Sequence, residues 1–338
     1  MSTPKPSATD AGIFLWMTYQ AMSQAGLDCA AIFASVGMPD EPPDQNQRRE
    51  NWTQDRFWQA AERVSGNPDI GLHIGGLMPA FRGQVLEYLF LSSPDFGEGL
   101  RRAIRYRRLL TDAMPLGLRV EGDIAVIHGL EHPVRHYLEC AYAIFLQFFR
   151  HVTDGEFLPR EIWLPHATGA SAADYQRVYR CPVRLGMAEG CIRFDATLLD
   201  RPSPAAEPQL LAMHETLATQ RMADLERRDL VTKVKRELGG LLEGGEISLD
   251  AVAQRLERNP RTLRADLSQA GMNFNEIVAQ YRERLARRLL ARTQEPIDQI
   301  VYLTGFSEPS AFTRAFKRWT GETPMAYRQR RQAEPGKD

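Results

Sequence analysis

The chain has 338 residues, of which 43% are hydrophobic and 25% charged, with a formal net charge of −1. This composition is ordinary for globular proteins, and the length exceeds one typical core, so we expect more than one domain. No apolar run approaches the ~18 residues that cross a bilayer, and residues 1–5 lack the apolar start of a signal peptide. The four cysteines show no C-x-x-C spacing, which argues against a disulfide framework or a zinc site. We therefore expect a cytoplasmic protein with no membrane partner and no cofactor.

The first two hundred residues predict helices first, and then strands and helices mixed. Helical periodicity marks four segments, namely 9–35, 51–65, 84–91 and 96–111. Alternating apolar residues next predict a β-hairpin, with strands at 116–120 and 124–128 and a turn at Glu121-Gly122-Asp123. The remaining elements, in chain order, are a helix at 135–151, a strand at 161–164, a helix at 171–179 and strands at 182–186 and 191–194. This order is typical of an α+β domain, and it leaves the strand order open.

A predicted helix with a modest apolar face follows at 204–230 and links the two parts of the chain. Its apolar positions include Leu210, Leu211, Leu217 and Leu225. Two interpretations stay open, because the helix is either a plain connection or one that mediates dimerisation or relays a signal. Just beyond it, the pairs Gly239-Gly240 and Gly244-Gly245 predict short flexible breaks.

Next along the chain, a short helix, a break and a second helix are predicted. The first helix has apolar Leu249, Val252 and Leu256 on one face. After the break, Asn259 is a favourable N-cap and Pro260 suits the first helical position. The second helix carries Arg261, Thr262 and Arg264, which we take as candidate DNA contacts.

A longer helix at 275–292 connects this pair to a further one. Its apolar stripe contains Ile277, Val278, Tyr281, Leu285 and Leu289, and five arginines occupy other positions. At ~1.5 Å per residue the helix spans roughly 27 Å. That length is of the order of the ~34 Å that separates two successive major-groove faces of DNA.

The most informative segment, 297–328, predicts a short helix, a glycine turn and a helix whose two faces differ. Gly305 allows a tight turn, and Ser307 is expected to be the N-cap, with Glu308 and Pro309 in the first helical turn. Phe312, Phe316 and Trp319 recur at helical spacing and predict one buried face. The opposite face is polar and positive, with Ser310, Thr313, Arg314, Lys317 and Arg318. This is the plan of a helix-turn-helix motif whose second helix enters a DNA major groove.

The distribution of charge supports the same interpretation. Residues 231–331 hold 18 Lys and Arg against 12 Asp and Glu, a net charge of +6, whereas residues 1–230 have a net charge of −6. A basic domain attracts phosphates and releases their counterions. The net charge of the whole chain is near zero because an acidic N-terminal part offsets a basic C-terminal third. This basic third predicts binding to double-stranded promoter DNA.

The C-terminal motifs resemble those of the AraC/XylS family of bacterial transcription regulators. The resemblance is carried by Gly305-Phe306-Ser307, Phe312-x-x-x-Phe316-Lys317-Arg318, Thr320-Gly321 and Pro324-x-x-Tyr327-Arg328. It implies an all-α DNA-binding domain with two helix-turn-helix motifs joined by a long helix. Ala265 stands where relatives commonly place a long polar or basic reader. Asp266, which phosphates would repel, is expected to point aside or to pair with Arg264 or another basic residue.

The N-terminal part resembles the sensor domain of one AraC-type subgroup, often labelled arabinose-binding-like although its members are not sugar sensors as a class. The resemblance is carried by Gly71-Leu72-x-Ile74-Gly75, Arg82-Gly83-x-x-x-Glu87-Tyr88, Ser92-Ser93-Pro94 and Val178-Tyr179-x-Cys181-Pro182-Val183-Arg184. The expected domains are a sensor at 1–203, a helical linker at 204–232, a DNA-binding domain at 233–331 and a disordered tail at 332–338.

No enzyme motif is present in the sequence, and we expect no enzymatic activity. There is no G-x-S-x-G, Walker loop or H-E-x-x-H. The segment Gly71–Gly76 lacks the strand-turn-helix setting of a dinucleotide fingerprint. His132 and His136 could offer two imidazoles on one helical face, but no third metal ligand is apparent, and we expect two surface histidines.

Two functions from different classes remain open. In the first, the sensor domain binds a small-molecule effector, amphipathic or carboxylate-bearing, that controls DNA binding. The second makes the N-terminal domain a protein-interaction module without a small-molecule ligand. RNA polymerase and a second copy of the chain are further candidate partners. The candidate effector contacts are Arg105 and Tyr106, in a basic cluster with Arg101, Arg102, Arg107 and Arg108, and Lys233 and Lys235 near the domain junction.

Overall fold

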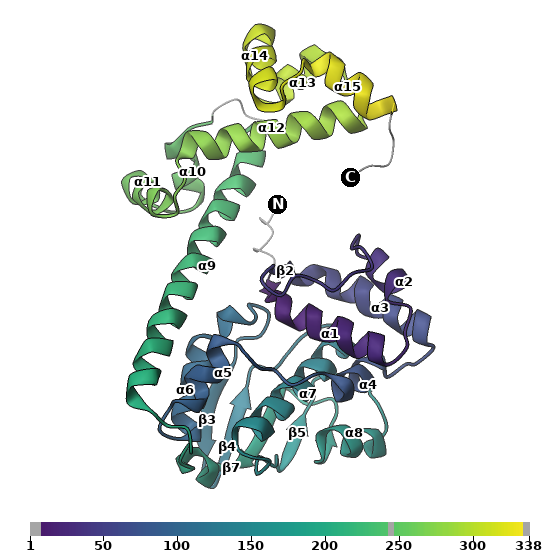
Figure 1. The fold of residues 1–338 in the computed structure, drawn as a ribbon, viewed down its shortest axis with the longest axis vertical. Helices are drawn as coiled ribbons and strands as arrows, with labels where there is room; N and C mark the ends of the chain where they lie inside the picture. Colours follow the sequence, from purple (N-terminus) through teal and green to yellow (C-terminus); the bar gives the residue numbers. More distant parts are fainter. Residues whose placement is uncertain (1–7, 243–246, 334–338) are drawn as a thin grey trace. The chain divides into compact units, whose positions relative to one another are not determined.

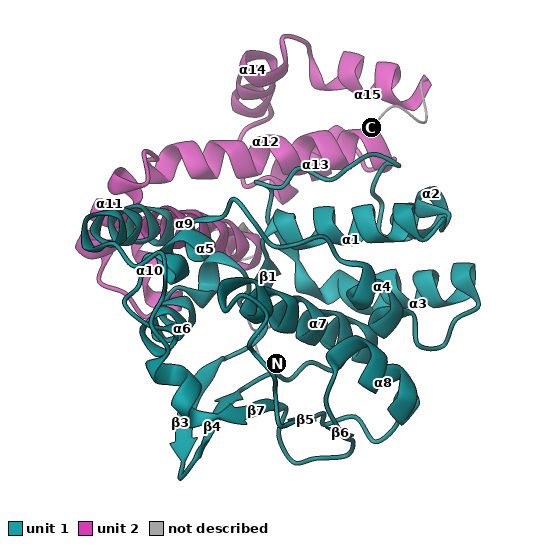
Figure 2. Ribbon diagram, turned by 60° about the horizontal axis from the view of Figure 1, so that its bottom comes forward, with its two compact units in different colours: residues 1–222 teal, residues 223–338 magenta. Residues whose placement is uncertain are grey.

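The computed structural model of the chain describes residues 8–242 and 247–333 (Figure 1). It divides into two compact units, Met1–Met222 and Ala223–Asp338, drawn in teal and magenta in Figure 2. The boundary falls inside helix α9 (Pro208–Leu242), whose first turns belong to one unit and whose later turns belong to the other. The predicted fold classes are confirmed, because helices and a sheet build the N-terminal unit and helices build the C-terminal one.

The N-terminal unit departs from the predicted elements at several places. The single helix expected at 9–35 is wrong: the short strand β1 (Thr9–Asp10) precedes α1 (Gly12–Gln24), and a turn separates α1 from α2 (Cys29–Ala34). The helix begins anew because the Asp28 side chain accepts a hydrogen bond from the Ala31 N–H. A helix not predicted, α4, occupies Ile70–Leu77.

The strand β2 (Arg49–Glu50) was not predicted either, and the helix expected at 96–111 is shorter, because α6 (Phe96–Arg105) is followed by a separate 3-10 turn at Arg107–Leu109. The other helices and strands of this unit agree with the predictions to within a few residues at their ends. In chain order they are α3 (Gln54–Ser65), α5 (Val85–Leu91), β3 (Gly117–Glu121), β4 (Ile124–His128), α7 (Arg135–Val152), β5 (Glu161–Trp163), α8 (Ala172–Tyr179), β6 (Val183–Arg184) and β7 (Cys191–Asp195).

Two sheets organise these strands. β1 and β2 form a small antiparallel ribbon, in which Asp10 is the partner of Arg49. The five-stranded sheet has the order β3-β4-β7-β5-β6, with a parallel pairing only between β5 and β6. The predicted hairpin is confirmed, since Glu121 pairs with Ile124 and leaves Gly122 and Asp123 as a two-residue turn.

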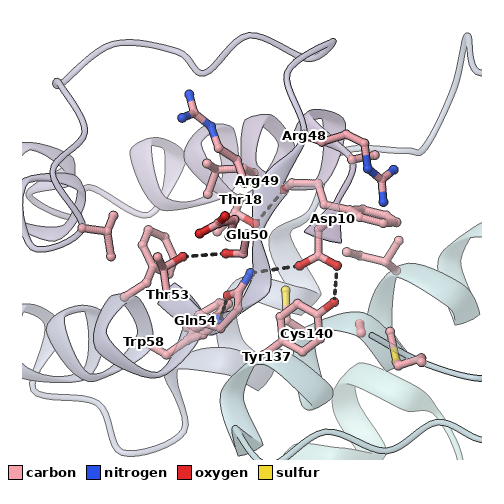
Figure 3. A pocket seen from close by; sticks show the side chains of 18 of the residues that line it. Asp10, Thr18, Arg48, Arg49, Glu50, Thr53, Gln54, Trp58, Tyr137 and Cys140 are labelled. Atoms are coloured by element: carbon pink, nitrogen blue, oxygen red, sulfur yellow. Dashed lines mark hydrogen bonds between the residues drawn. The ribbon is translucent and has the colours of Figure 1, made fainter. Parts of the chain in front are cut away.

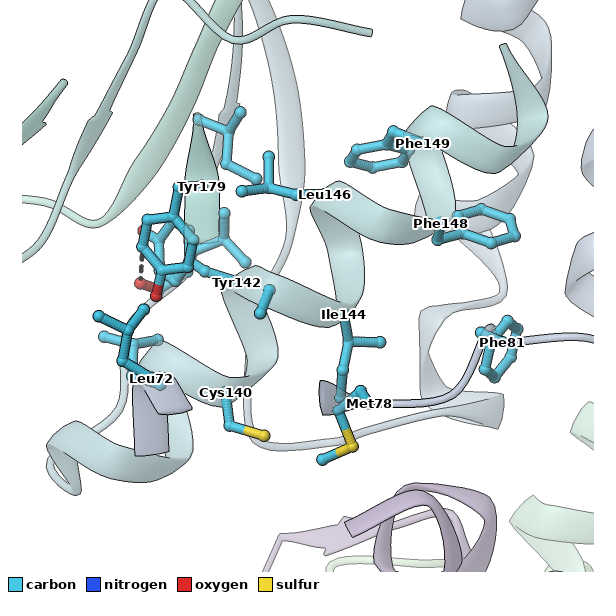
Figure 4. Close-up of a cluster of buried hydrophobic side chains, with 14 of the residues drawn as sticks. Leu72, Met78, Phe81, Cys140, Tyr142, Ile144, Leu146, Phe148, Phe149 and Tyr179 are labelled. Atoms are coloured by element: carbon cyan, nitrogen blue, oxygen red, sulfur yellow. Dashed lines mark hydrogen bonds between the residues drawn. The ribbon is translucent and has the colours of Figure 1, made fainter. Parts of the chain in front are cut away.

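Helix α7 is the centre of the N-terminal core. Most of its residues are buried, on every side of the helix. Figure 4 shows Tyr142, Ile144 and Phe148 pointing in different directions from α7, with Leu72 and Tyr179 beside it. The Tyr179 hydroxyl donates a hydrogen bond of 2.7 Å to the carbonyl of Glu139, which ties α8 to this helix.

The missed helix α4 packs closely on α7 because it contains glycines at the contact. A Cβ built on Gly71 would lie 2.3 Å from the Cα of His136, whereas one on Gly76 would meet nothing closer than a Val178 methyl at 3.4 Å. Real Cβ atoms do not approach backbone atoms to 2.3 Å, so Gly71 is required for packing.

These two glycines give a matched test on one helix. We expect Gly71→Ala to lower the free energy of unfolding by about 1–3 kcal/mol, because the new methyl group pushes α4 away from α7. Gly76→Ala is the control and should be neutral or stabilising by up to about 1 kcal/mol, since alanine favours helix. Chemical denaturation of the full chain measures both, and equal losses for the two variants would contradict the close-packing account.

The C-terminal unit is entirely helical over the residues described. After the last part of α9 it contains α10 (Leu249–Arg255), α11 (Pro260–Gln269), α12 (Phe274–Arg292), α13 (Ile297–Leu303), α14 (Pro309–Thr320) and α15 (Pro324–Ala333). Two separate clusters of buried side chains hold it together. The first contains Val234 and Leu238 of α9, Val252 of α10, Leu263 of α11 and Ile277 of α12.

The second cluster lies around the other half of α12. Ala286 and Leu290 of α12 pack there with Ile300 of α13 and with Phe312 and Phe316 of α14, all fully buried. One helix therefore contributes to both clusters, and each cluster contains one short helix followed by a second helix. The predicted pair of helix-turn-helix motifs joined by a long helix is confirmed.

Two local expectations for this unit are wrong, and two others fall partly or wholly outside the described residues. Ser307 is not the N-cap of α14: Glu308 takes that position, without a side-chain capping bond, and Pro309 is the first helical residue. The break expected at Gly239-Gly240 does not occur, because α9 continues through both glycines. Gly244 and Gly245 lie outside the described residues. So do residues 334–338 of the expected tail, whereas residues 332–333 end α15.

Candidate DNA interface and effector cavity

Helix α11 presents the predicted residues of the first motif on its exposed side. Asn259 caps the helix by accepting a hydrogen bond of 2.8 Å from the Arg261 N–H, as expected. Leu263 and Leu267 are buried in the first cluster, while Arg261, Thr262 and Arg264 are all exposed. The three candidate contacts therefore lie together on the face that packing leaves free.

Asp266 is paired as expected, with a basic residue other than Arg264. Its carboxylate accepts a hydrogen bond of 2.7 Å from the Arg258 guanidinium in the turn before α11. This ion pair neutralises the one carboxylate of α11. The exposed side chain of Ala265 leaves only a methyl group at the position where relatives commonly carry a longer side chain.

Helix α14 has two faces of opposite chemistry, as predicted. Phe312 and Phe316 are fully buried in the second cluster. On the other side, Thr313 is half-buried and the rest of the predicted contacts are exposed, namely Ser310, Arg314, Lys317 and Arg318. Over the stretches 8–242 and 247–333, no carboxylate forms an ion pair with Arg314, Lys317 or Arg318. Their charges are thus available to an external anion.

Arg282 on α12, which the sequence analysis did not single out, holds the turn of the second motif. Its guanidinium donates a hydrogen bond of 2.8 Å to the carbonyl of Gly305 and lies 4.8 Å from the centre of the Phe306 ring. Gly305 has φ of +72°, a conformation that favours glycine. Burial lowers the pKa of the Arg282 guanidinium. The turn that aims α14 is therefore fixed to α12 by a half-buried cation.

The candidate effector residues of the N-terminal unit, Arg105 and Tyr106, lie against each other and close to α9. Tyr106 is buried, and its hydroxyl lies 3.0 Å from Thr219 of α9; the exposed Arg105 guanidinium lies over its ring. In the C-terminal unit, Lys233 is exposed and Lys235 donates to Gln280 at 3.1 Å. Much of the basic cluster around Tyr106 is ion-paired, because Glu98 contacts Arg101 and Arg102 and Asp112 contacts Arg108.

A cavity of about 310 Å³ lies elsewhere in the N-terminal unit, between α1, α3, α7 and the β1–β2 ribbon. None of the four candidate effector residues lines it. Its wall is mainly apolar and includes Phe14, Leu15, Phe57, Met114, Ile144 and Phe145, and its charged lining residues are Asp10, Arg48, Arg49 and Glu50. Figure 3 shows Asp10, Gln54 and Tyr137 meeting at one side of this cavity. An apolar pocket with a few convergent polar groups is the usual form of a small-molecule site.

Asp10 is the polar centre of the cavity wall. One carboxylate oxygen accepts from Tyr137 at 2.9 Å and from Thr111 at 2.6 Å, and the other accepts from Asn51 at 2.7 Å and from Gln54 at 3.3 Å. Burial and the charge of Asp10 raise the pKa of Tyr137 well above its ordinary value, which keeps its hydroxyl protonated as a donor. Sequence reasoning missed this site because its members are far apart along the chain.

A second, smaller cavity of about 50 Å³ adjoins the first and shares the wall residues Phe14, Ile144 and Phe145 with it. Its other wall comes from α5 and α6, through Leu86, Leu100 and Ile104. The same two helices hold the first turns of α9. The polar contacts there are Ser92 with His214 at 3.1 Å, Arg102 with Glu215 at 3.2 Å, and Tyr106 with Thr219 at 3.0 Å.

His132 and His136 are not the surface pair that the sequence suggested. His132 lies before α7 and contacts Asn51, while His136 is buried and contacts Glu62. Within the described residues no group of three or more His, Cys, Asp or Glu side chains could hold a metal ion. Among the helices of those same residues, none is long and apolar enough to cross a bilayer.

Comparison with known proteins gives two family matches. The profile described as the arabinose-binding domain of AraC transcription regulator, N-term, matches residues 26–203, and a helix-turn-helix domain profile matches residues 252–330. The ornithine utilization regulator of Pseudomonas aeruginosa is 26% identical over 316 residues, which cover 91% of this chain and 93% of that protein.

Two further proteins extend the comparison. The HTH-type transcriptional regulator VirS of Mycobacterium tuberculosis is 30% identical over 203 residues, 59% of this chain and 58% of VirS. The crystal structure of the transcriptional regulator CdpR from Pseudomonas aeruginosa covers 97% of this chain and 100% of its own, with 19% identity and a TM-score of 0.46. The family matches confirm both resemblances found in the sequence. The chain belongs to the AraC family of transcription regulators, with an arabinose-binding-type N-terminal domain and a DNA-binding helix-turn-helix region.

Proposed function

We propose that this regulator reads two successive major-groove segments of promoter DNA, and that a small-molecule effector bound in its N-terminal unit controls that reading. The observation that carries the effector half is the apolar cavity with charged groups at one side. A regulator of this kind acts on DNA rather than by catalysis. Its place of action is the cytoplasm, where bacterial promoter DNA lies.

The DNA half rests on the two exposed basic faces. α11 offers Arg261, Thr262 and Arg264, and α14 offers Ser310, Thr313, Arg314, Lys317 and Arg318. Arginine and lysine neutralise phosphates, and arginine can also bind guanine edges through two hydrogen bonds. Helix α12, with 19 residues, spans about 28 Å. That spacing suits two readers placed about one turn of DNA apart.

The effector half rests on the size and lining of the cavity. About 310 Å³ lies at the lower end of the ~300–1,000 Å³ usual for small-molecule sites. An amphipathic effector fits this lining, with its apolar body against Phe14 and Phe145 and a charged head toward Asp10 and Arg49. The name of the ornithine utilization regulator supports a metabolite as the kind of effector, because that relative spans nearly the whole chain.

A protein partner is the competing explanation for the N-terminal unit. The exposed large apolar side chains Trp52, Val64, Val120 and Leu158 lie on separate segments, which is ordinary for a surface. Leu210, Met213 and Leu217 on α9 are exposed at heptad spacing and favour a contact with another protein or a second copy. Three side chains are a small area, so we rank the effector first.

Helix α9 offers a route from the cavity to the DNA-binding residues. The smaller cavity separates the effector site from α5 and α6, which hold the first turns of α9 through three polar contacts. An effector that moves α5 or α6 changes this docking, and α9 continues into the C-terminal unit. The effector can change DNA binding by no more than its difference in binding free energy between the two docking states. Tyr106 belongs to this relay.

The first DNA prediction separates phosphate contacts from base contacts on α14. Lys317→Ala should weaken binding about equally on all sequences and lower the slope of log K against log salt by about one unit. Arg314→Ala should cost about 1–3 kcal/mol on the selected operator and relax the preference at one base pair. Titrations at several salt concentrations measure both, and unchanged binding in both variants would remove α14 from the interface.

The second DNA prediction ranks the two motifs. α14 presents hydroxyl and guanidinium donors to the DNA. On α11, the two positions after Arg264 offer only the methyl group of Ala265 and the ion-paired carboxylate of Asp266. We therefore expect α14 to carry most of the base discrimination. A base-by-base operator scan with the wild type, Arg264→Ala and Arg314→Ala tests this order. The ranking is wrong if the base pairs that Arg264→Ala affects prove the more sharply specified half.

The effector prediction uses a variant that fills the cavity. Ala141 lines it on α7, and Ala141→Phe should abolish retention of the effector while the variant still binds operator DNA. Ala173→Phe, at an exposed position of α8, is the matched control and should behave as the wild type. Native mass spectrometry of the purified full chain measures retained small molecules. Retention of the same compound by Ala141→Phe would mean that the effector binds elsewhere.

A further inference from the structure

The charges around the cavity are not paired with one another. Asp10 is only 4% exposed, and all four of its hydrogen-bond donors are neutral groups. Within residues 8–242 and 247–333, no Lys, Arg or His side chain forms an ion pair with it. A buried carboxylate ordinarily needs a cationic partner, because desolvation of an unpaired charge is costly. Asp10 is therefore a negative charge in the wall of an apolar cavity. Its hydrogen-bonding capacity is satisfied, but no positive group compensates its charge.

Arg49 presents the opposite charge at the rim of the same cavity. It is the cross-strand partner of Asp10 in the β1–β2 ribbon, and partners of this kind project from the same face of a sheet. Its guanidinium donates to the neutral Gln47 amide at 2.7 Å, and its buried Nε has no partner among the residues described. No carboxylate in those residues pairs with it.

Arg48 differs from its neighbour, although it lines the cavity too. Its guanidinium pairs with Asp112 at 3.3 Å and donates to the backbone carbonyls of Thr9 and Leu109. It is therefore engaged in holding the ribbon to the rest of the unit. Glu50, the fourth charged lining residue, is exposed and accepts a hydrogen bond from the Trp52 indole N–H. Asp10 and Arg49 remain as the cross-strand pair of opposite charge, each without a charged partner among the residues described.

From this arrangement we infer that the effector is a small zwitterion of the amino-acid type. The inference rests on the proposed effector function of the cavity. The ligand's ammonium group lies at Asp10, where it replaces the longest of the four bonds, the 3.3 Å contact from Gln54. Its carboxylate binds Arg49, and its apolar side chain lies along Phe14, Met114 and Ile144.

Ligands with a single charge satisfy this site only in part. A simple carboxylate pairs with Arg49 but brings a second negative charge next to Asp10, and like charges at short distance repel. An amine without a carboxylate pairs with Asp10 and leaves Arg49 unpaired. Hydrogen bonds to charged groups contribute about 1.5–3 kcal/mol each, so the zwitterion should gain on the order of 10-fold or more over either ligand.

The test compares three probes with the same six-carbon chain, namely norleucine, hexanoate and hexylamine. Calorimetric titration of the dialysed full chain should give norleucine an affinity at least about 10-fold above the other two. Asp10→Asn should remove the preference over hexanoate, and Arg49→Gln the preference over hexylamine. Arg63→Gln, at an exposed position of α3 outside the cavity, is the control and should keep both preferences.

The outcomes separate this inference from the proposed function on which it rests. Equal affinity for hexanoate and norleucine, or no binding of any probe, overturns the zwitterion. Neither result bears on the proposal that an effector binds in the cavity, which is tested separately by the retention of small molecules in Ala141→Phe. Because Asp10 holds four donors, Asp10→Asn could also loosen the fold. The wild-type probe series and the Arg49→Gln variant at the rim therefore test the zwitterion independently of Asp10→Asn.

Discussion

The DNA-reading part of this protein depends on one helix that belongs to two hydrophobic clusters. Ile277 near the start of α12 is buried with α9, α10 and α11, and Leu290 near its end is buried with α13 and α14. Between them, Arg282 binds the carbonyl of Gly305 and fixes the turn before α14. Because an α-helix of this length is stiff, both recognition helices inherit their separation from α12. In the proposed function, the spacing of the DNA contacts is therefore a property of a single element.

The N-terminal unit follows a comparable logic around Asp10. Its carboxylate joins the β1 strand to the turn before α3 through Asn51 and to the start of α3 through Gln54. It also bonds Thr111 in the segment after α6 and Tyr137 on α7. These are the segments that enclose the larger cavity. The group that holds the walls together is thus also an unpaired charge in the wall of the cavity. A ligand that binds Asp10 acts directly on the contacts between these segments.

The sequence predicted the elements whose signal is local. Helix α11 is an example, since Asn259 and Pro260 mark its start and Leu263 and Leu267 its buried face. Helix α4 was not predicted because three of its eight residues are glycine, which has a low helix propensity. The reason for these glycines is the close approach of α7 at His136, which only the tertiary structure shows. The role of Arg282 was equally hidden, because its partner Gly305 is distant in the chain.

The candidate effector site shows the same limit more strongly. Arg105 and Tyr106 stood out in the sequence as a basic cluster beside an aromatic residue, yet the fold gives neighbouring arginines to Glu98 and Asp112. The larger cavity takes its lining from β1, α1, β2, α3 and α7, and no local pattern links Asp10 with Tyr137. Tertiary structure alone brings such residues together. The function of the motif-rich C-terminal third could therefore be predicted from the sequence far better than the site in the N-terminal unit.

The most direct test of the central claim is a hydroxyl-radical footprint of the full chain on an operator selected from random DNA. If α12 sets the distance between α11 and α14, two protected segments should appear on one face of the duplex, centred about 10–10.5 base pairs apart. A single protected segment, or two segments at another spacing, would contradict the account that one shared helix positions both readers.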